Sequence, residues 1–140
     1  MTSAGARVHW VALLGGHAGA YAYSWRLLGP NNRELGRSTY ASPTVDEAYT
    51  HVVSVKSVVR TDCFRYSRNS RGDWAWAAVI DDDRQLRSCR EFRRERECVY
   101  NAGVFLERLL ATDIQPPQPD ARLVAVRASV FLGEEPAVSL

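Results

Sequence analysis

The sequence has few cysteines, and their spacing argues against two kinds of small scaffold. Its 140 residues include three cysteines, Cys63, Cys89 and Cys98, and no Cys-x-x-Cys pair. An odd number without paired spacing supports neither a disulfide framework nor a zinc knuckle. We therefore expect a reduced, cytoplasmic protein that holds no metal ion and no other cofactor.

Lysine and long hydrophobic runs are also scarce. Lys56 is the only lysine, so nearly all basic side chains are arginines, and the net charge is only +2. A charge this small creates no strong overall field toward nucleic acid or a membrane. The apolar stretch Val8–Leu14 is broken by His9 and followed by glycines. It is too short for a signal peptide or a membrane span, so we expect no membrane association.

One stretch of the chain occurs twice. Residues 24–62 align without gaps on residues 75–113, which places Trp25 on Trp76. The same offset places Arg33 on Arg84, Leu35 on Leu86, Tyr49 on Tyr100, Val53 on Val104 and Thr61-Asp62 on Thr112-Asp113. Both copies have an apolar face, a polar turn and an apolar run. The repeat indicates how the fold is organised, and it contains no recognisable catalytic motif.

The first copy predicts three strands and a helix. Strict alternation of aromatic and small residues is typical of a strand, and Ser42-Pro43 with Thr44-x-x-Glu47 is typical of a helix start. The predicted strands are Arg7–Leu14, Tyr21–Leu28 and Glu34–Thr39, and the valine-rich helix is Ala48–Val59. Gly15–Gly19 is interpreted as a turn in which two or more residues need a positive φ.

The second copy predicts the same order of elements. Its strands are Cys63–Ser67, Trp74–Ile80 and Arg84–Cys89, and its helix is Glu91–Leu110. The proline-rich segment that follows is typical of a stiff linker, and the valine alternation after it predicts a last strand.

These elements predict an α+β fold. Two ββ(β)α repeats cannot each bury both faces, so we expect one mainly antiparallel sheet with two helices on one face. The tryptophans of the two copies should meet the helices. The predicted boundaries are 7–60 and 61–114 for the repeats, 115–121 for the linker, 122–132 for the C-terminal strand and 133–140 for a disordered tail.

The pattern resembles the YegP-like family, a small bacterial and archaeal domain of unknown function. The matching residues are Tyr21–Leu28, Asn31-Asn32, Ser38-Thr39-Tyr40 and Val53–Lys56, with a weaker second set at Asp73–Ile80, Ser88 and Gly103–Glu107. The resemblance covers residues 7–110 and departs from the family pattern at Asp81-Asp82-Asp83. It implies tandem repeats in a single antiparallel sheet, with the C-terminal strand exchanged into the first repeat. It brings no established catalytic residues.

Arginine is concentrated in the second copy. An arginine cluster interleaved with aromatic residues is typical of polyanion or single-stranded nucleic-acid binding. Seven acidic residues in the same window favour instead a solvated, ion-paired surface. Nucleic acid is therefore an alternative partner that we do not favour. The candidate polyanion-binding residues are Arg65, Arg68, Arg71, Arg87, Arg90, Arg93 and Arg94.

Motifs for metal, phosphate or nucleophilic chemistry are better interpreted as structural. Asp81-Asp82-Asp83 aligns with a hairpin turn, which makes it a turn rather than a cation site. The glycine-rich turn lacks the Lys and the helix of a phosphate loop. His9, His17 and His51 have no paired ligand spacing, and no base is positioned to activate a cysteine.

Small apolar side chains on the other face of the second-copy strand suggest an interface. Ala75, Ala77 and Val79 would be exposed on a sheet covered by helices on one side only. We therefore expect a non-enzymatic module that binds a protein partner or self-associates. The alternatives are polyanion binding through the second copy and, third, a small enzyme with a site between the repeats.

Overall fold

A computed structural model describes residues 5–15, 21–119 and 123–133 of the chain. The strands are β1 (Arg7–Leu14), β2 (Ala22–Leu28), β3 (Glu34–Ser38), β4 (Phe64–Arg68), β5 (Trp74–Ile80), β6 (Asp83–Arg87) and β7 (Val124–Arg127). They form one sheet in the order β4-β5-β6-β3-β2-β1-β7. All neighbours are antiparallel except β7, which runs parallel to β1. The expected α+β fold with one mainly antiparallel sheet is confirmed.

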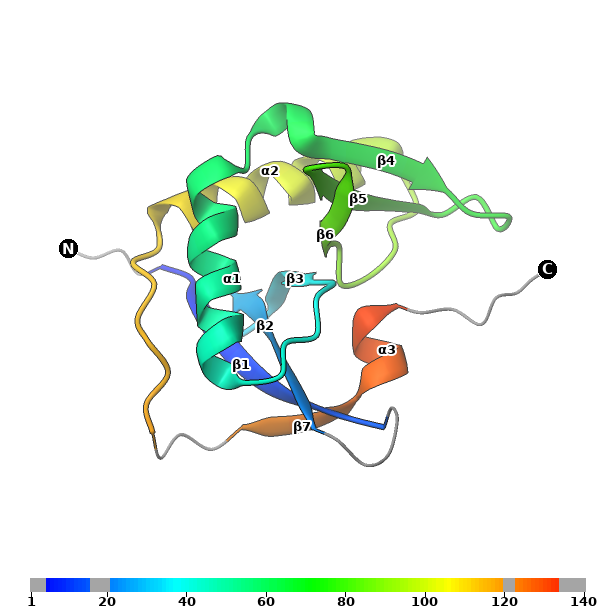
Figure 1. Cartoon of the computed structure of the whole chain (residues 1–140). Helices are drawn as coiled ribbons and strands as arrows, with labels where there is room; N and C mark the ends of the chain where they lie inside the picture. The colour runs from blue at the N-terminus through cyan, green and yellow to red at the C-terminus, as the bar shows by residue number, and fades with distance from the viewer. Residues whose placement is uncertain (1–4, 16–20, 120–122, 134–140) are drawn as a thin grey trace.

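Helices cover both faces of this sheet (Figure 1). They are α1 (Val45–Val58), α2 (Glu95–Ala111) and α3 (Ala128–Leu132), with a short 3-10 turn, η2 (Thr61–Cys63). Trp25 and Leu27 of β2 point to the face that α1 and α2 cover, and we call it the inner face. Val11 and Leu13 of β1 point the opposite way and pack against Phe131 of α3. We call this second face the outer face.

The prediction of a C-terminal strand over residues 122–132 is wrong in its second half. Val124 and Val126 do pair with Val11 and Leu13 of β1, so the terminal strand joins the first half of the sheet as expected. Arg127 pairs with Leu14, the last residue of β1. Beyond that point a strand would have no partner on β1, and a helical turn satisfies the backbone groups internally.

Two predicted segments fall partly or wholly outside the described residues. Residues 16–20 contain most of the predicted glycine-rich turn, and residues 134–140 contain most of the predicted tail. Gly133 is described and ends α3 in the left-handed conformation with φ 71°.

The gapless alignment of the two copies is wrong for the residues that follow the hairpin turns, because the two turns differ in length. Asp81 and Asp82 both have positive φ and form a two-residue turn, as predicted for a turn rather than a metal site. Between equivalent strand pairs, the stretch from Leu28 to Glu34 is one residue longer than the stretch from Val79 to Arg84. Pairing therefore puts Gly36 of β3, not Leu35, in the place of Leu86 of β6. Whether the halves are copies of one unit stays a prediction.

Helix α1 begins at Val45, directly after the predicted cap Thr44, whereas α2 begins at Glu95, later than the predicted Glu91. Thr44 caps α1 by accepting a hydrogen bond from the Glu47 amide at 3.0 Å. Ser42, the other predicted cap, instead bridges to Tyr23. Phe92 makes the same kind of bridge to Trp74, which keeps the residues before Glu95 out of α2.

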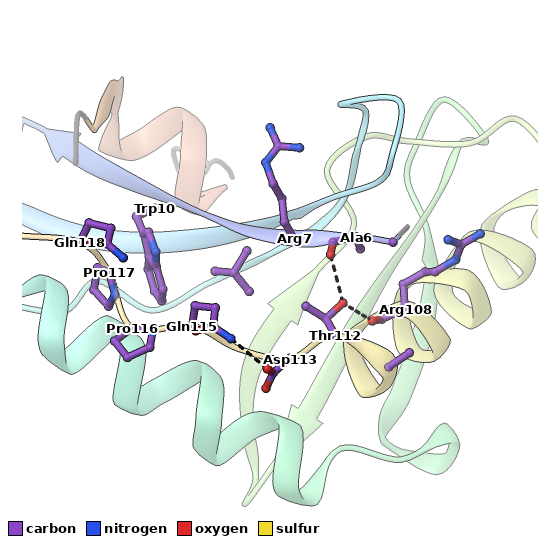
Figure 2. Close-up of a pocket in the computed structure, with 13 residues that line it drawn as sticks. Ala6, Arg7, Trp10, Arg108, Thr112, Asp113, Gln115, Pro116, Pro117 and Gln118 are labelled. Carbon is purple, nitrogen blue, oxygen red and sulfur yellow. Dashed lines mark hydrogen bonds between the residues drawn. The ribbon is translucent and has the colours of Figure 1, made fainter. Parts of the chain in front are cut away.

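The proline-rich segment after α2 runs beside β1, and the two line a hollow together (Figure 2). Ile114 packs against the hydrophobic core. The Thr112 hydroxyl donates to the Arg108 carbonyl at 2.6 Å and lies 3.4 Å from the Ala6 carbonyl, and Lys56 donates to the Thr112 carbonyl. These contacts fix the start of the predicted linker to both the sheet and α1.

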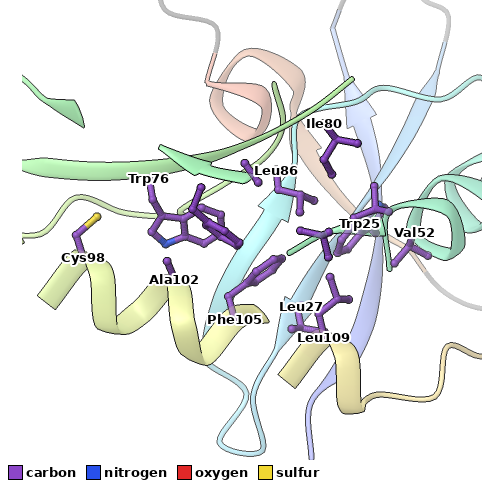
Figure 3. Packing of buried hydrophobic residues seen from close by; sticks show 14 of the residues in the cluster. Trp25, Leu27, Val52, Trp76, Ile80, Leu86, Cys98, Ala102, Phe105 and Leu109 are labelled. Carbon is purple, nitrogen blue, oxygen red and sulfur yellow. The ribbon is translucent and has the colours of Figure 1, made fainter. Parts of the chain in front are cut away.

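A single inner-face cluster draws on both halves of the chain (Figure 3). Trp25 and Trp76 are both buried in it, as predicted. Each indole N–H donates to the helix above it, Trp25 to His51 Nδ1 at 3.0 Å and Trp76 to Asn101 Oδ1 at 2.7 Å. A buried indole needs such a partner, so these two bonds fix how each helix sits on the sheet.

Candidate functional site

His51 of α1 is held neutral by its neighbours on the inner face. The Trp25 indole is only a donor, so Nδ1 of His51 accepts and Nε2 carries the proton. Nε2 lies 3.0 Å from Gln85 Oε1, while the Gln85 amide nitrogen donates to the Ile80 carbonyl. Burial lowers the pKa of His51 below its ordinary value. With both ring nitrogens engaged, the arrangement is that of a structural histidine.

His51 should make the fold sensitive to acid. Because the pKa of His51 is lower in the folded than in the unfolded chain, the folded state binds fewer protons. The free energy of unfolding should then fall as pH drops through about 6.5, the unfolded-state pKa of histidine. His51→Asn should keep the indole acceptor, as Asn101 does for Trp76. Urea unfolding between neutral and mildly acidic pH should show a smaller pH slope in this variant, and an unchanged slope would contradict the assignment.

The surroundings of Cys89 and Cys98 disfavour a role as nucleophile. Burial raises the pKa of Cys98 to about 11. Burial, followed by the charge of Glu34, also raises the pKa of Cys89. A thiol needs a lowered pKa to act as a nucleophile at neutral pH. Among the described residues, no three His, Cys, Asp or Glu side chains are grouped so that they could hold a metal ion.

No helix within the described ranges is both long and apolar enough to cross a membrane.

The outer face carries a row of cationic residues that the strand pairing places side by side. His9 of β1 pairs with Arg26 of β2, Arg26 pairs with Arg37 of β3, and Arg37 pairs with Arg87 of β6. The row continues through Ala77 of β5 to Arg65 of β4. We call the three arginines Arg26, Arg37 and Arg87 the cationic row, and His9 lies at its β1 end. Like charges directly opposite one another destabilise a sheet, so the row needs compensation.

Part of the compensation comes from one carboxylate. Glu34 of β3 accepts from Arg37 Nη2 at 2.7 Å and from Arg26 Nη1 at 3.4 Å. Arg26 in turn donates its Nε–H to His9 Nδ1 at 2.9 Å. Burial and the charge of Arg26 lower the pKa of His9, which keeps it a neutral acceptor near pH 7.

Arg87 is less fully compensated. Burial and then the charge of Arg37 lower the pKa of its guanidinium. Its Nη2 reaches carbonyl oxygens of α3, but its buried Nε has no hydrogen-bond partner among the described residues. A buried donor without a partner costs about 1–3 kcal/mol. Such a group is a candidate contact for an acceptor supplied from outside.

A hollow of about 350 Å³ lies beside Arg87. Its lining includes the small side chains Ala75 and Ala77 of β5 and Gly133 at the end of α3. The lining is completed by Ser67, Arg68, Asn69, Asp73, Trp76, Arg84, Arg87, Ser88 and Glu91. The outer-face patch predicted from Ala75, Ala77 and Val79 is thus partly a basic hollow rather than a flat apolar surface. Self-association through it stays a prediction.

The structure divides the seven arginines predicted to bind a polyanion. Arg68 and Arg87 line the hollow, and Arg65 ends the cross-strand line with its guanidinium bonded to the Asp62 carbonyl at 2.7 Å. The others lie elsewhere. Arg71 pairs with Glu91, Arg90 lies over the Phe92 ring, Arg94 pairs with Glu97 at the start of α2, and Arg93 precedes it.

Sequence reasoning missed Arg26, Arg37 and Arg84. Arg26 and Arg37 belong to the first copy, outside the arginine-rich window. The alternation of β2 could have placed Arg26 on the face opposite Trp25. The pairing of β3 with β6, which joins Arg37 to Arg87, has no local signal in the sequence.

Two further hollows lie on the inner side. One, of about 720 Å³, lies between β1, the end of α2 and the proline-rich segment, and Trp10 points toward Pro116 and Pro117 across it while Arg7 points away (Figure 2). The other, of about 660 Å³, lies between α2 and Leu35, with Tyr100 at its edge. Both hollows, like the one beside Arg87, are lined by side chains of both charge signs.

No family model matches the sequence, and no curated protein matches it. Among solved structures, the chain is similar to the solution NMR structure of YegP, a protein of unknown function from E. coli. The TM-score is 0.57 at 7% sequence identity, covering 89% of this chain and 96% of that one. A UPF0339 protein from Shewanella oneidensis, also solved by NMR, gives a TM-score of 0.52 at 7% identity, covering 77% of this chain and 89% of the other. The resemblance to YegP-like proteins is therefore confirmed at the level of the fold.

Proposed function

We propose that the chain is a non-enzymatic binding module whose outer face takes a carboxylate-rich segment of a partner protein. The observation that carries the proposal is the cationic row, in which arginines of β2, β3 and β6 face one another directly. Sheets avoid such pairs unless something offsets the repulsion. Places where a protein departs from a local rule are often functional sites.

Carboxylates fit this face better than nucleic acid does. Guanidinium groups bind carboxylates in a planar, bidentate geometry that adds specificity as well as free energy. Binding of single-stranded nucleic acid usually needs exposed aromatic rings on which bases stack. The strand positions that face outward in the described residues carry arginine, histidine, glutamate, serine and aliphatic side chains. Trp74, at the end of β5, lies under the Arg68 guanidinium.

The surroundings of the row support binding rather than catalysis. The histidine at the end of the row uses Nδ1 to accept from Arg26, and the pKa of His9 is lowered. Glu34 is bound by two arginines. A carboxylate held in this way is a poor general base, because its lone pairs are already engaged.

Arg84→Gln should test the proposal without disturbing the fold. Arg84 is exposed, lines the hollow, and makes no side-chain hydrogen bond among the described residues. We expect about tenfold weaker binding of a fluorescein-labelled Glu/Asp peptide, because a charge-assisted hydrogen bond contributes about 1.5–3 kcal/mol. Fluorescence anisotropy at fixed salt is the measurement.

Arg93→Gln is the matched control, since it removes the same charge from an exposed arginine away from the outer face. It should change the affinity less than about twofold, as surface charges of this kind contribute little. Equal losses in both variants would show that net charge alone attracts the peptide. Tighter binding of a single-stranded DNA probe, lost in Arg84→Gln, would make nucleic acid the partner class and overturn the proposal. A loss confined to Arg93→Gln would point to the arginines before α2.

A further inference from the structure

Carbonyl oxygens of helix α3 occupy the places at the cationic row where an anionic partner would have to put its own acceptor atoms. The Phe131 carbonyl accepts from Arg37 Nη1 at 3.2 Å and from Arg87 Nη2 at 3.0 Å. The Val130 carbonyl accepts from Arg87 Nη2 at 3.3 Å. The Arg37 guanidinium also lies over the Phe131 ring, 4.4 Å from its centroid. Arg87 is thus held by neutral carbonyl oxygens of the chain itself, and at Arg37 one such oxygen occupies Nη1 while Glu34 binds Nε and Nη2.

The anchor that keeps α3 in place is small. Phe131 is the one buried residue of the helix, at 1% exposure, and packs with Val11 and Leu13. Val130, next to it, is 65% exposed. A helix of five residues is not stable on its own, so α3 depends on Phe131, on the partly buried Ala128 and Leu132 that pack against the same cluster, and on the arginines. Segments with so few buried contacts open at low free-energy cost.

Docking of α3 leaves Arg87 imperfectly bonded. A Cβ added to Gly133 would lie 3.0 Å from both Cζ and Nε of Arg87, so the end of α3 packs tightly on the guanidinium. The carbonyl oxygens reach Nη2, while the buried Nε has no partner among the described residues. A carboxylate that approached from the side of α3 could bind Nε and Nη2 together, in the bidentate mode that arginine prefers.

We propose that α3 is a built-in competitor for the outer face, displaced when a carboxylate-rich partner binds. The inference rests on the proposed function and deepens it, because it names how access to Arg37 and Arg87 is controlled. A carbonyl and a carboxylate both accept from the charged guanidinium, but a carboxylate adds the attraction of its own negative charge and can bind in the bidentate mode. An acidic segment therefore outcompetes α3 for the two arginines, whereas a neutral segment does not.

Phe131→Ala in the full chain separates α3 from the sheet while keeping every arginine. The apparent dissociation constant of a partner equals its intrinsic value divided by the fraction of molecules with the site open. We expect the labelled Glu/Asp peptide to bind about tenfold more tightly to Phe131→Ala than to the unaltered chain. Val130→Ala is the matched control, because it shortens an exposed side chain of the same helix. It should bind as the unaltered chain does.

Hydrogen exchange on the unaltered chain provides a test that does not depend on whether a variant folds. Saturating peptide should accelerate exchange of the α3 amides, including that of Gly133, which donates to the Ser129 carbonyl at 3.2 Å. A peptide that binds the unaltered chain, leaves these amides protected and binds Phe131→Ala no more tightly would overturn the α3 proposal. The proposed function would survive that result. Failure of the peptide to bind either protein would overturn the proposed function, and the role of α3 with it.

Discussion

Gly36→Ala is expected to lower the free energy of unfolding by about 3 kcal/mol, near the upper end of typical overpacking penalties. Gly36 lies in β3 on the inner face, directly beneath α2. A Cβ at this position would lie 2.6 Å from Cδ1 of Phe105 and 2.8 Å from Cη2 of Trp76. Both rings are fully buried and packed against each other, with centroids 5.0 Å apart, so neither can move aside easily. The glycine is there because the two rings need the space above the strand.

Gly103→Ala provides a control in which the same substitution should have the opposite sign. Gly103 lies within α2 on an exposed face, and a Cβ there would meet nothing within 4 Å. Replacing a glycine inside a helix by alanine stabilises by about 0.5–1 kcal/mol. Urea unfolding followed by circular dichroism measures both. If Gly36→Ala proved as stable as the unaltered chain, α2 could not sit as close to β3 as described.

The strands and their inward faces could be predicted from the sequence because they depend on local alternation. Trp25 and Trp76 lie in stretches where every second side chain is large and apolar, and one sheet face must bury them. The boundaries of β5 were predicted correctly for this reason, and those of β1 because that stretch is rich in residues that favour strands. Helix α1 was harder, since valine favours strands, but its buried stripe of Ala48, Val52 and Val55 has helical spacing.

What could not be predicted depends on contacts between distant segments. The two turns differ by one residue, and only the observed pairing shows that the alignment of the copies shifts there. Valine alternation around Val124 indicates a strand correctly. It carries no information about where the partner strand ends, and Leu14 of β1 decides that. Helix α3 forms where β1 no longer offers a partner strand, and Phe131 of this helix packs on the apolar side chains of Val11 and Leu13.

The candidate site was half predictable for the same reason. A high local density of arginine drew attention to the second copy, which does supply Arg68 and Arg87. The other half of the outer face, Arg26 and Arg37, comes from strands whose arginines are sparse in the sequence. They join Arg87 only because β3 and β6 pair at the centre of the sheet. Arginines that are far apart in the sequence can thus be brought side by side by strand register alone.

Trp76→Ala is expected to destabilise the whole chain, not only the half to which it belongs. Large-to-alanine substitutions of a buried tryptophan cost about 3–5 kcal/mol, out of a total stability of about 5–15 kcal/mol for a typical domain. Trp76 belongs to the same buried cluster as Trp25 and Val52, which come from β2 and α1 of the first half. Loss of packing around Trp76 therefore removes support from α1 as well as from α2.

Thermal unfolding of Trp76→Ala should then remain a single transition at a lower midpoint, the same by tryptophan fluorescence and by circular dichroism. Trp25→Ala, the equivalent change in the first half, should lower the midpoint by a similar amount, since both indoles are fully buried and hydrogen-bonded to a helix. Two separate transitions in either variant, one of them at the midpoint of the unaltered chain, would mean that the halves unfold independently. That outcome would contradict the shared core, because removal of one tryptophan from a cluster that contains both weakens the packing around the other.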